Sequence, residues 1–199
     1  NYLHILIDDD SWEPIPIGVT EHRRILALRR DVAHITHKNG EADGIQLGYE
    51  WAHFPYINEV PNPKFDYVFL IESDVVVQEH GWDQKQIDLI QSLPSDWGSL
   101  DVQSIDEEGK VTYPCTVSPR HDEFQNENFE WIHYPDWQLT LFNPKLFELG
   151  MKFNDSVSHF DILFGRRMAN LGFKAYRSKQ LKVLHIQGGG NSRAYLNKL

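Results

Sequence analysis

The segment Phe65–Val77, FDYVFLIESDVVV, constrains the fold of this chain more than any other. Its first half is an apolar run that follows a proline-rich stretch, a pattern typical of a buried β-strand. Two carboxylates, Glu72 and Asp74, then interrupt the run before three valines follow. Carboxylates with apolar residues on both sides are not typical of a surface loop. The segment therefore predicts a strand whose end carries a binding site, and the alternative is a solvated turn between a strand and a loop.

Strand-like and helix-like segments alternate along the chain, which predicts an α/β fold with an open, mixed, mostly parallel sheet and flanking helices. The expected strands are residues 2–7, 32–37, 65–77, 97–105, 137–144 and 174–187, the last forming a pair of strands. The expected helices are residues 21–30, 45–54, 84–93, 145–150 and 158–172, the last ending at Gly172. Residues 106–135 are expected to form a long connection or a short antiparallel excursion.

Length, charge and cysteine content narrow the class of protein. The chain has 199 residues, enough for one well-buried domain, so we expect a single domain over residues 1–199. Its net charge of -10 argues against binding to a nucleic-acid backbone. The single cysteine, Cys115, excludes an internal disulfide and a cysteine-rich zinc site. No window approaches the length of about 18 apolar residues that a membrane span needs. We expect a cytoplasmic protein, free or peripheral to the inner face of a membrane.

Two groups of acids, Asp8–Asp10 and Glu72–Asp74, each follow a strand-like run. Ligands bind at the carboxyl ends of the strands in open α/β sheets. In an extended chain Glu72 and Asp74 point the same way, and two adjacent carboxylates repel each other unless a cation lies between them. Mn2+ and Mg2+ take oxygen ligands and are held by one or two carboxylates together with substrate phosphates. The pattern therefore predicts a divalent metal at Glu72 and Asp74.

This pattern resembles the Asp-x-Asp motif of metal-dependent glycosyltransferases with the nucleotide-sugar-binding GT-A fold, in particular those of the family 2 type. Further stretches are similar to motifs of that family, and in their order and spacing they cover most of the chain. They are HILIDDDSWE, HITHKNGEADGIQLGYEWAH, FNPKLFELG, SHFDILFGRRMANLGFKAY and VLHIQGGG. The resemblance implies a nucleotide-sugar-binding half at about residues 1–77 and an acceptor-binding half at about residues 78–199.

The resemblance also implies roles for individual residues. Asp8 is the acid that contacts the nucleotide base, and Asp161 is the catalytic base of inverting members. His185 completes the metal site of Asp74 and Glu72. The nucleotide-sugar-binding residues that it implies are Asp8, Asp9, Ser11, Asn39, Glu72, Asp74 and Arg193. The implied reaction is metal-dependent transfer of a sugar, from a UDP-sugar in preference to a GDP-sugar, to a hydroxyl group of a carbohydrate or glycoconjugate, with inversion.

The sequence departs from the family pattern at three points. Glu72 stands where the family has Asp, Phe160 replaces the acid that precedes the base, and no stretch corresponds to the family's first strand. An inactive sugar- or nucleotide-binding module on the same fold is therefore the alternative. A glycoside hydrolase with Asp161 as the second carboxylate ranks last, because Glu72 and Asp74 are too close in sequence to flank a sugar.

Several of these residues also have a structural interpretation. Asp161 completes a Ser-x-x-acid capping box with Ser158 at a helix start, and His185 lies in an apolar strand where core histidines are common. The glycines of residues 188–190 and the following Arg193 either close over a diphosphate or belong to a frayed terminus. The aromatic residues Trp131, Tyr134 and Trp137 either belong to the core or stack against an acceptor sugar.

Overall fold

The computed structural model of the protein describes residues 4–8, 25–29, 46, 49–50, 56–57, 60–61, 66–72, 75–112, 126–135, 137–153 and 160–186. The chain forms two compact units. The first consists of Asn1–Asp66 with Lys152–Phe160, and the second of Tyr67–Met151 with Asp161–Leu199. The candidate site described below belongs to the second unit.

The first unit contains two small sheets. Strand β1 (His4–Asp8) runs parallel to β2 (Ile25–Arg29), and β3 (Tyr56–Ile57) pairs antiparallel with β4 (Val60–Pro61). The strand expected at residues 2–7 is confirmed by β1, whereas the helix expected over residues 21–30 is wrong because β2 occupies its centre. β2 begins with four consecutive apolar residues, and such unbroken runs are typical of strands in parallel pairs.

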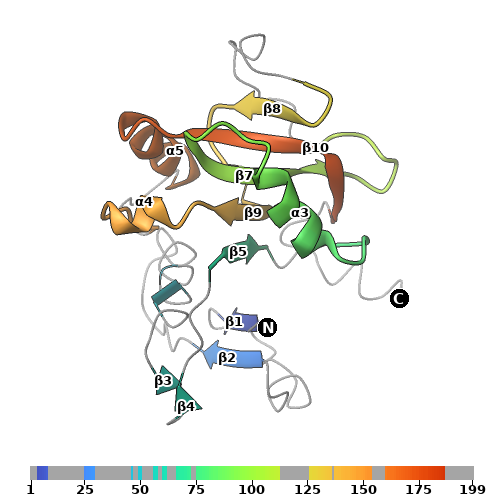
Figure 1. Ribbon diagram of the computed structural model, residues 1–199. Coiled ribbons are helices and arrows are strands. Elements are labelled where there is room, and N and C mark those ends of the chain that lie inside the picture. Colours follow the sequence, from blue (N-terminus) through green and yellow to red (C-terminus); the bar gives the residue numbers. More distant parts are fainter. Residues whose placement is uncertain are drawn as a thin grey trace. The chain divides into compact units, whose positions relative to one another are not determined.

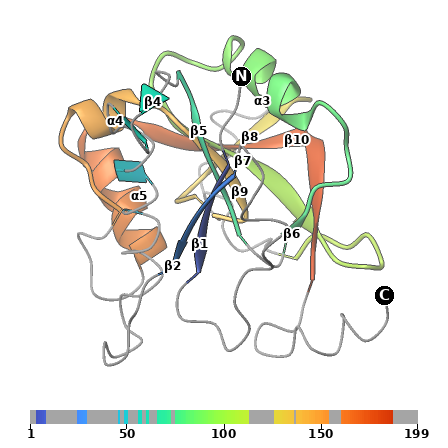
Figure 2. The same cartoon turned by 90° about the horizontal axis from the view of Figure 1, so that it is seen from below.

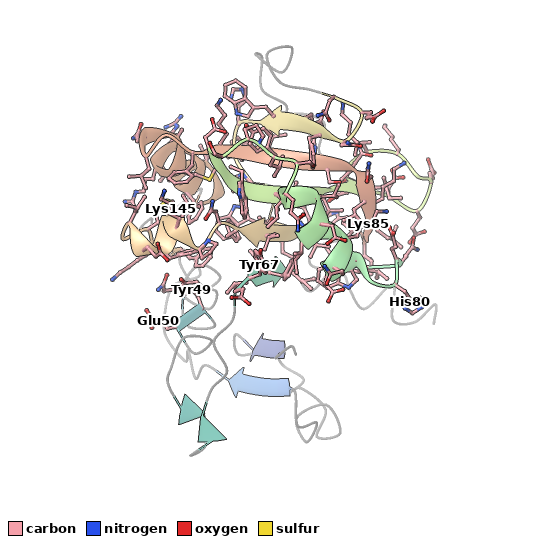
Figure 3. The ribbon with its side chains drawn as sticks, in the orientation of Figure 1. Tyr49, Glu50, Tyr67, His80, Lys85 and Lys145 are labelled. Atoms are coloured by element: carbon pink, nitrogen blue, oxygen red, sulfur yellow. The ribbon has the colours of Figure 1, made fainter. Side chains whose placement is uncertain are left out.

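A helical segment of the first unit fixes the chain that returns to it. Gln46, Tyr49 and Glu50 are helical, in agreement with the helix expected over residues 45–54. The Gln46 side chain accepts a hydrogen bond from the Phe153 N–H at 2.9 Å and donates one to Glu50 Oε1 at 2.9 Å. The ring of Tyr49, labelled with Glu50 in Figure 3, meets the Phe153 ring edge-on at a centroid distance of 5.8 Å.

The second unit is built on a six-stranded mixed sheet (Figure 1). Its strands are β5 (Val68–Ile71), β6 (Val75–Val76), β7 (Trp97–Ile105), β8 (Phe129–Ile132), β9 (Leu139–Phe142) and β10 (Lys174–His185). Their order is β5-β9-β7-β10-β6, and β8 also pairs with β10. The expected open mixed α/β sheet is confirmed. The expectation that it is mostly parallel is wrong for this sheet, because β7 and β10 are parallel and its other four pairings are antiparallel.

Helices cover both faces of this sheet. Leu89 and Ile90 of α3 (Trp82–Ile90) belong to a core cluster with Leu139 and Leu141 of β9. Phe142, the next residue of β9, instead meets Phe164 of α5 (Phe160–Asn170) at a ring-centroid distance of 5.4 Å. Because successive side chains of a strand point to opposite faces, α3 and α5 lie on opposite faces of the sheet.

The short helix α4 (Lys145–Glu148) and helix α5 confirm the helices expected at residues 145–150 and 158–172. Gly172 ends α5 with a φ of 84°, a conformation that glycine adopts without strain. The Gly172 N–H donates to Ala169 O at 2.9 Å and the Phe173 N–H donates to Met168 O at 3.0 Å, which is the Schellman pattern. Within the described ranges, every helix is too short or too polar to cross a lipid bilayer.

Candidate functional site

Three strands of the second unit point their carboxyl ends to one edge of the sheet. β5 and β7 are both antiparallel to β9, and β10 is parallel to β7. β5, β7 and β10 therefore run in the same direction and end at Ile71, Ile105 and His185. The predicted ligand Glu72 follows the first of these strands and His185 ends the last. Ligands of open α/β sheets bind at this edge, so the topology puts both residues where a site is expected.

Strand β10 bends before it reaches this edge, and its last residues lie beside β6 (Figure 2). While β7 advances by one residue, from Val102 to Gln103, β10 advances by four, from Ser178 to Lys182. The Ser178 hydroxyl accepts hydrogen bonds from the backbone N–H groups of Gln180 and Leu181 at 3.1 and 3.3 Å. β10 is thus one bent strand, and the pair of strands expected at residues 174–187 is wrong.

Helix α3 also contacts this bend. Lys85 donates to the carbonyl of Gln180 at 3.2 Å and also pairs with Glu79 at 2.8 Å. Figure 3 shows Lys85 on the part of α3 that lies near the bend. The bulge therefore has side-chain partners from β10 itself and from α3.

The bend brings His185 to the segment that follows the acid pair. His185 and Val75 are Cα partners in the antiparallel pair of β10 and β6, and the His185 side chain is buried, with 8% of its surface exposed. The Val75 N–H donates to the carbonyl of Glu72 at 3.3 Å. Val75 therefore contacts both predicted ligands, and Asp74 is its neighbour in the sequence.

Glu72 itself is half-buried just beyond the end of β5. Its N–H donates to the carbonyl of Gln138 at 3.0 Å. The hydrogen bond from the Val75 N–H to the Glu72 carbonyl joins two residues that are three apart in the sequence, and β5 and β6 are separate strands. The prediction that Glu72 and Asp74 share a face depended on one extended run, and Asp74 lies outside the described residues.

The donor atoms that these residues offer fit a divalent cation. A carboxylate oxygen from Glu72 and an imidazole nitrogen from His185 are ligands that Mn2+ accepts. Among the described residues no three His, Cys, Asp or Glu side chains form a group that could hold a metal ion. A complete metal site at this edge therefore requires at least one further ligand, and the residue predicted from the sequence is Asp74.

Asp161 lies in the first turn of α5, which begins at Phe160. Its side chain and Ser158 lie outside what the structure describes, so the capping box stays a prediction. One turn further on, α5 comes very close to the segment at Tyr134. A Cβ added to Gly165 would collide with the Cβ of Tyr134 and lie 2.9 Å from its Cα. The absence of a side chain at Gly165 therefore allows α5 to approach residues 133–134 closely, one turn after Asp161.

The remaining predicted site residues are less fully described. Asp8 ends β1 and is the Cα partner of Arg29, and only its backbone is described. Five predicted site residues lie outside the described ranges: Asp9, Ser11, Asn39, Asp74 and Arg193.

The two tryptophans of the predicted stacking wall have different surroundings. Trp137 belongs to the core, with 1% of its surface exposed, and its ring lies 5.3 Å from that of Phe164. Trp131 on β8 is half-buried, and the Lys174 ammonium group lies 5.1 Å from its ring centroid. Lys174 begins β10, at the edge opposite the candidate site, so the position of Trp131 fits a structural contact.

A group of buried polar residues in the same sheet was not predicted from the sequence. Ser99, Asp101 and Ser104 of β7, with Gln138 and Thr140 next to or in β9, all have at most 5% of their surface exposed. In the sequence, polar residues alternate with apolar ones at Ser99, Asp101 and Gln103. This pattern is typical of a strand with one face in solvent, and it gives no sign that α5 covers that face.

One tyrosine at the opposite edge has a shifted pKa. Burial raises the pKa of Tyr176 well above its ordinary value, and the negative charge and hydrogen bonding of Asp96 raise it further. The Tyr176 hydroxyl donates to Asp96 Oδ1 at 3.2 Å, and Lys174 pairs with Asp96 Oδ2 at 2.9 Å. This cluster joins the starts of β7 and β10 and lies away from the candidate site.

Comparison of the sequence with protein-family models and with curated proteins gives no match.

Proposed function

We propose that this protein transfers a sugar from a nucleotide-diphosphate sugar to a hydroxyl group of a carbohydrate or glycoconjugate, with Mn2+ or Mg2+ at the carboxyl edge of the sheet. The observation that carries the proposal is the pairing of His185 with Val75, whose N–H binds the carbonyl of Glu72. Two residues proposed as ligands on sequence grounds thus converge on one short segment. The residue between Ser73 and Val75 is Asp74, the third proposed ligand.

The proposed ligands suit the chemistry of this transfer. Glu72, Asp74 and His185 would hold the metal, which when bound stabilises the negative charge that develops on the departing diphosphate. The net charge of -10 gives the protein no general attraction for a diphosphate. A divalent cation held by acidic residues resolves this difficulty, because it supplies the positive charge locally.

The acceptor hydroxyl needs a base within hydrogen-bond reach, and we propose the carboxylate of Asp161. Asp161 removes the proton as the hydroxyl oxygen attacks the anomeric carbon and the bond to the diphosphate breaks. A single displacement of this kind inverts the anomeric configuration. The proposed contacts to the nucleotide are those implied by the resemblance, namely Asp8, Asp9, Ser11, Asn39 and Arg193. The preferred donor is a UDP-sugar, and the proposed location is the cytoplasm or the inner face of a membrane.

Calorimetry with Mn2+ and UDP tests the binding part of this proposal. We expect UDP to bind wild-type protein only when Mn2+ is present, and Asp74→Ala to abolish this binding. Asp83→Asn is the matched control, because Asp83 is an exposed acid of α3, and it should bind as wild type does. Failure of UDP and GDP to bind the wild-type protein with either metal would overturn the proposal.

A second experiment separates a transferase from a binding module on the same fold. Wild-type protein, a panel of UDP- and GDP-sugars and a panel of sugar acceptors are mixed, and free nucleoside diphosphate and the anomeric configuration of the product are measured. We expect release by wild type and loss of release in Asp161→Asn, with Mn2+-dependent UDP binding retained in the variant. Binding without release by the wild-type protein would show a binding module instead.

A further inference from the structure

The carboxylate of Asp101 is buried in the middle of β7, with 1% of the residue exposed. Its Oδ1 accepts hydrogen bonds from Thr140 Oγ1 at 2.6 Å and from the Trp137 N–H at 3.4 Å. Its Oδ2 accepts one from Ser99 Oγ at 3.2 Å. A buried carboxylate is costly unless it is hydrogen-bonded, so these donors have to stay in place. One of them, the Trp137 N–H, belongs to the segment that leads into β9.

The backbone at Trp137 is held in an unfavourable conformation. Its φ is 70°, the left-handed region that large side chains rarely adopt. Such a conformation persists only where the surroundings over-determine it. Here the ring is held between Phe142 and Phe164, at centroid distances of 5.5 and 5.3 Å, while Asp101 binds the N–H. The core and the carboxylate together therefore fix this turn of the chain.

The next residue, Gln138, connects the turn to the candidate site. Its carbonyl accepts the hydrogen bond from the Glu72 N–H at 3.0 Å, and its Oε1 accepts one from Ser104 Oγ at 3.0 Å. Glu72 in turn accepts from the Val75 N–H, and Val75 pairs with His185. Two hydrogen bonds, joined through the backbone of residues 137–138, thus lead from the buried carboxylate to the backbone of a proposed metal ligand.

We propose that Asp101 is a positioning residue for this site: by holding the strained backbone at Trp137 it fixes the Gln138 carbonyl, and through it Glu72. The role in metal binding rests on the proposed function, whereas the coupling of Asp101 to Glu72 does not. Residues that orient metal ligands without touching the metal change metal affinity by about 10- to 100-fold when they are replaced. Asp101 touches no proposed substrate atom, so it is not a catalytic residue.

Three variants test the proposal. Asp101→Asn removes the charge and one acceptor, and Thr140→Val removes the shortest hydrogen bond while the carboxylate keeps its charge. Ser99→Ala is the matched control, because it removes a hydrogen bond from Oδ2 of the same carboxylate, whereas the Trp137 N–H donates to Oδ1. Amide hydrogen exchange of Glu72, followed by NMR, reports the coupling, and calorimetry with Mn2+ reports metal affinity.

We expect Glu72 exchange to be at least about tenfold faster, and the Kd for Mn2+ about tenfold higher, in Asp101→Asn and Thr140→Val, with Ser99→Ala like wild type. Wild-type Glu72 exchange in the folded Thr140→Val protein would overturn the proposal even if Asp101→Asn failed to fold. An equal effect of Ser99→Ala would also overturn it, because the carboxylate would then act only through general stability. If wild-type protein bound no Mn2+, the proposed function would fail, and Glu72 exchange alone would decide the coupling.

Discussion

Val75 and His185 are Cα partners across the antiparallel pair of β6 and β10, and the residue before Val75 is Asp74. Directly opposed residues of an antiparallel pair have Cβ atoms about 4.5–5.5 Å apart and lie on the same face. The imidazole of His185 therefore lies beside the side chain of Val75, whose N–H is bound to Glu72. Residues from opposite halves of the chain meet at this point.

If His185 is a metal ligand, His185→Gln should weaken Mn2+ binding, because a glutamine of similar size offers no imidazole nitrogen. We expect the Kd measured by calorimetry to rise at least tenfold, a loss of about 1.4 kcal/mol. His133→Gln is the matched control: His133 is exposed and follows β8, whose Ile132 pairs with Ala175 near the other end of β10. Unchanged Mn2+ affinity in the folded His185→Gln protein would exclude His185 as a ligand.

Strands and helices with a clear period were predictable from the sequence. In β7 polar and apolar residues alternate from Ser99 to Gln103, and α5 is an amphipathic helix that ends before Gly172. Local pattern failed at β2, because a short apolar run between arginines fits a helix as well as a strand. The tertiary pairing with β1 decides between them, and no residue within Ile25–Arg29 encodes that pairing.

Local sequence patterns did not predict which strands of the sheet run parallel and which run antiparallel. β9 lies between β5 and β7 and pairs antiparallel with both of them. The position of β9 in the sheet depends on contacts between segments that are far apart in the sequence. The proposed ligands Glu72 and His185 were chosen because an acid and a histidine stand at expected strand ends in the sequence. The buried acceptor Asp101 did not, because in sequence it has the alternation of a solvent-facing residue.

The bend of β10 should depend on Ser178, whose hydroxyl accepts hydrogen bonds from two backbone N–H groups of the bulge. Ser178→Ala leaves the N–H of the buried residue Leu181 without this acceptor, so we expect a loss of about 1–3 kcal/mol in the free energy of unfolding. Urea denaturation measures this loss. Ser92→Ala removes a hydroxyl at the exposed end of α3 and should change stability by less than about 0.5 kcal/mol. Equal losses in the two variants would show that Ser178 has no special role in the bend.

Removing the carboxylate of the buried ion pair between β8 and β10 should lower the free energy of unfolding far more than removing the carboxylate of an exposed ion pair. Arg177 Nε lies 2.7 Å from Glu130 Oε1, and the two side chains are 2% and 12% exposed. Glu130→Gln leaves the buried guanidinium without its carboxylate, so we expect a loss of about 3 kcal/mol in urea denaturation. Glu79→Gln breaks an exposed pair of nearly the same length, with Lys85, and should cost about 0–1 kcal/mol. A loss below about 1 kcal/mol in Glu130→Gln would contradict this account.

Tyr176 should make the protein less stable in alkaline solution. Burial and the neighbouring Asp96 raise the pKa of Tyr176 above its ordinary value of 10.0. Above that pH the unfolded chain loses the phenolic proton while the folded protein keeps it, so the free energy of unfolding falls as pH rises. The contribution of this one proton approaches about 1.4 kcal/mol per pH unit. Tyr176→Phe removes it, so urea denaturation at a series of pH values above 10.0 should give a shallower decline in the variant than in wild type. Equal slopes in the two proteins would mean that the folded state does not protect this proton.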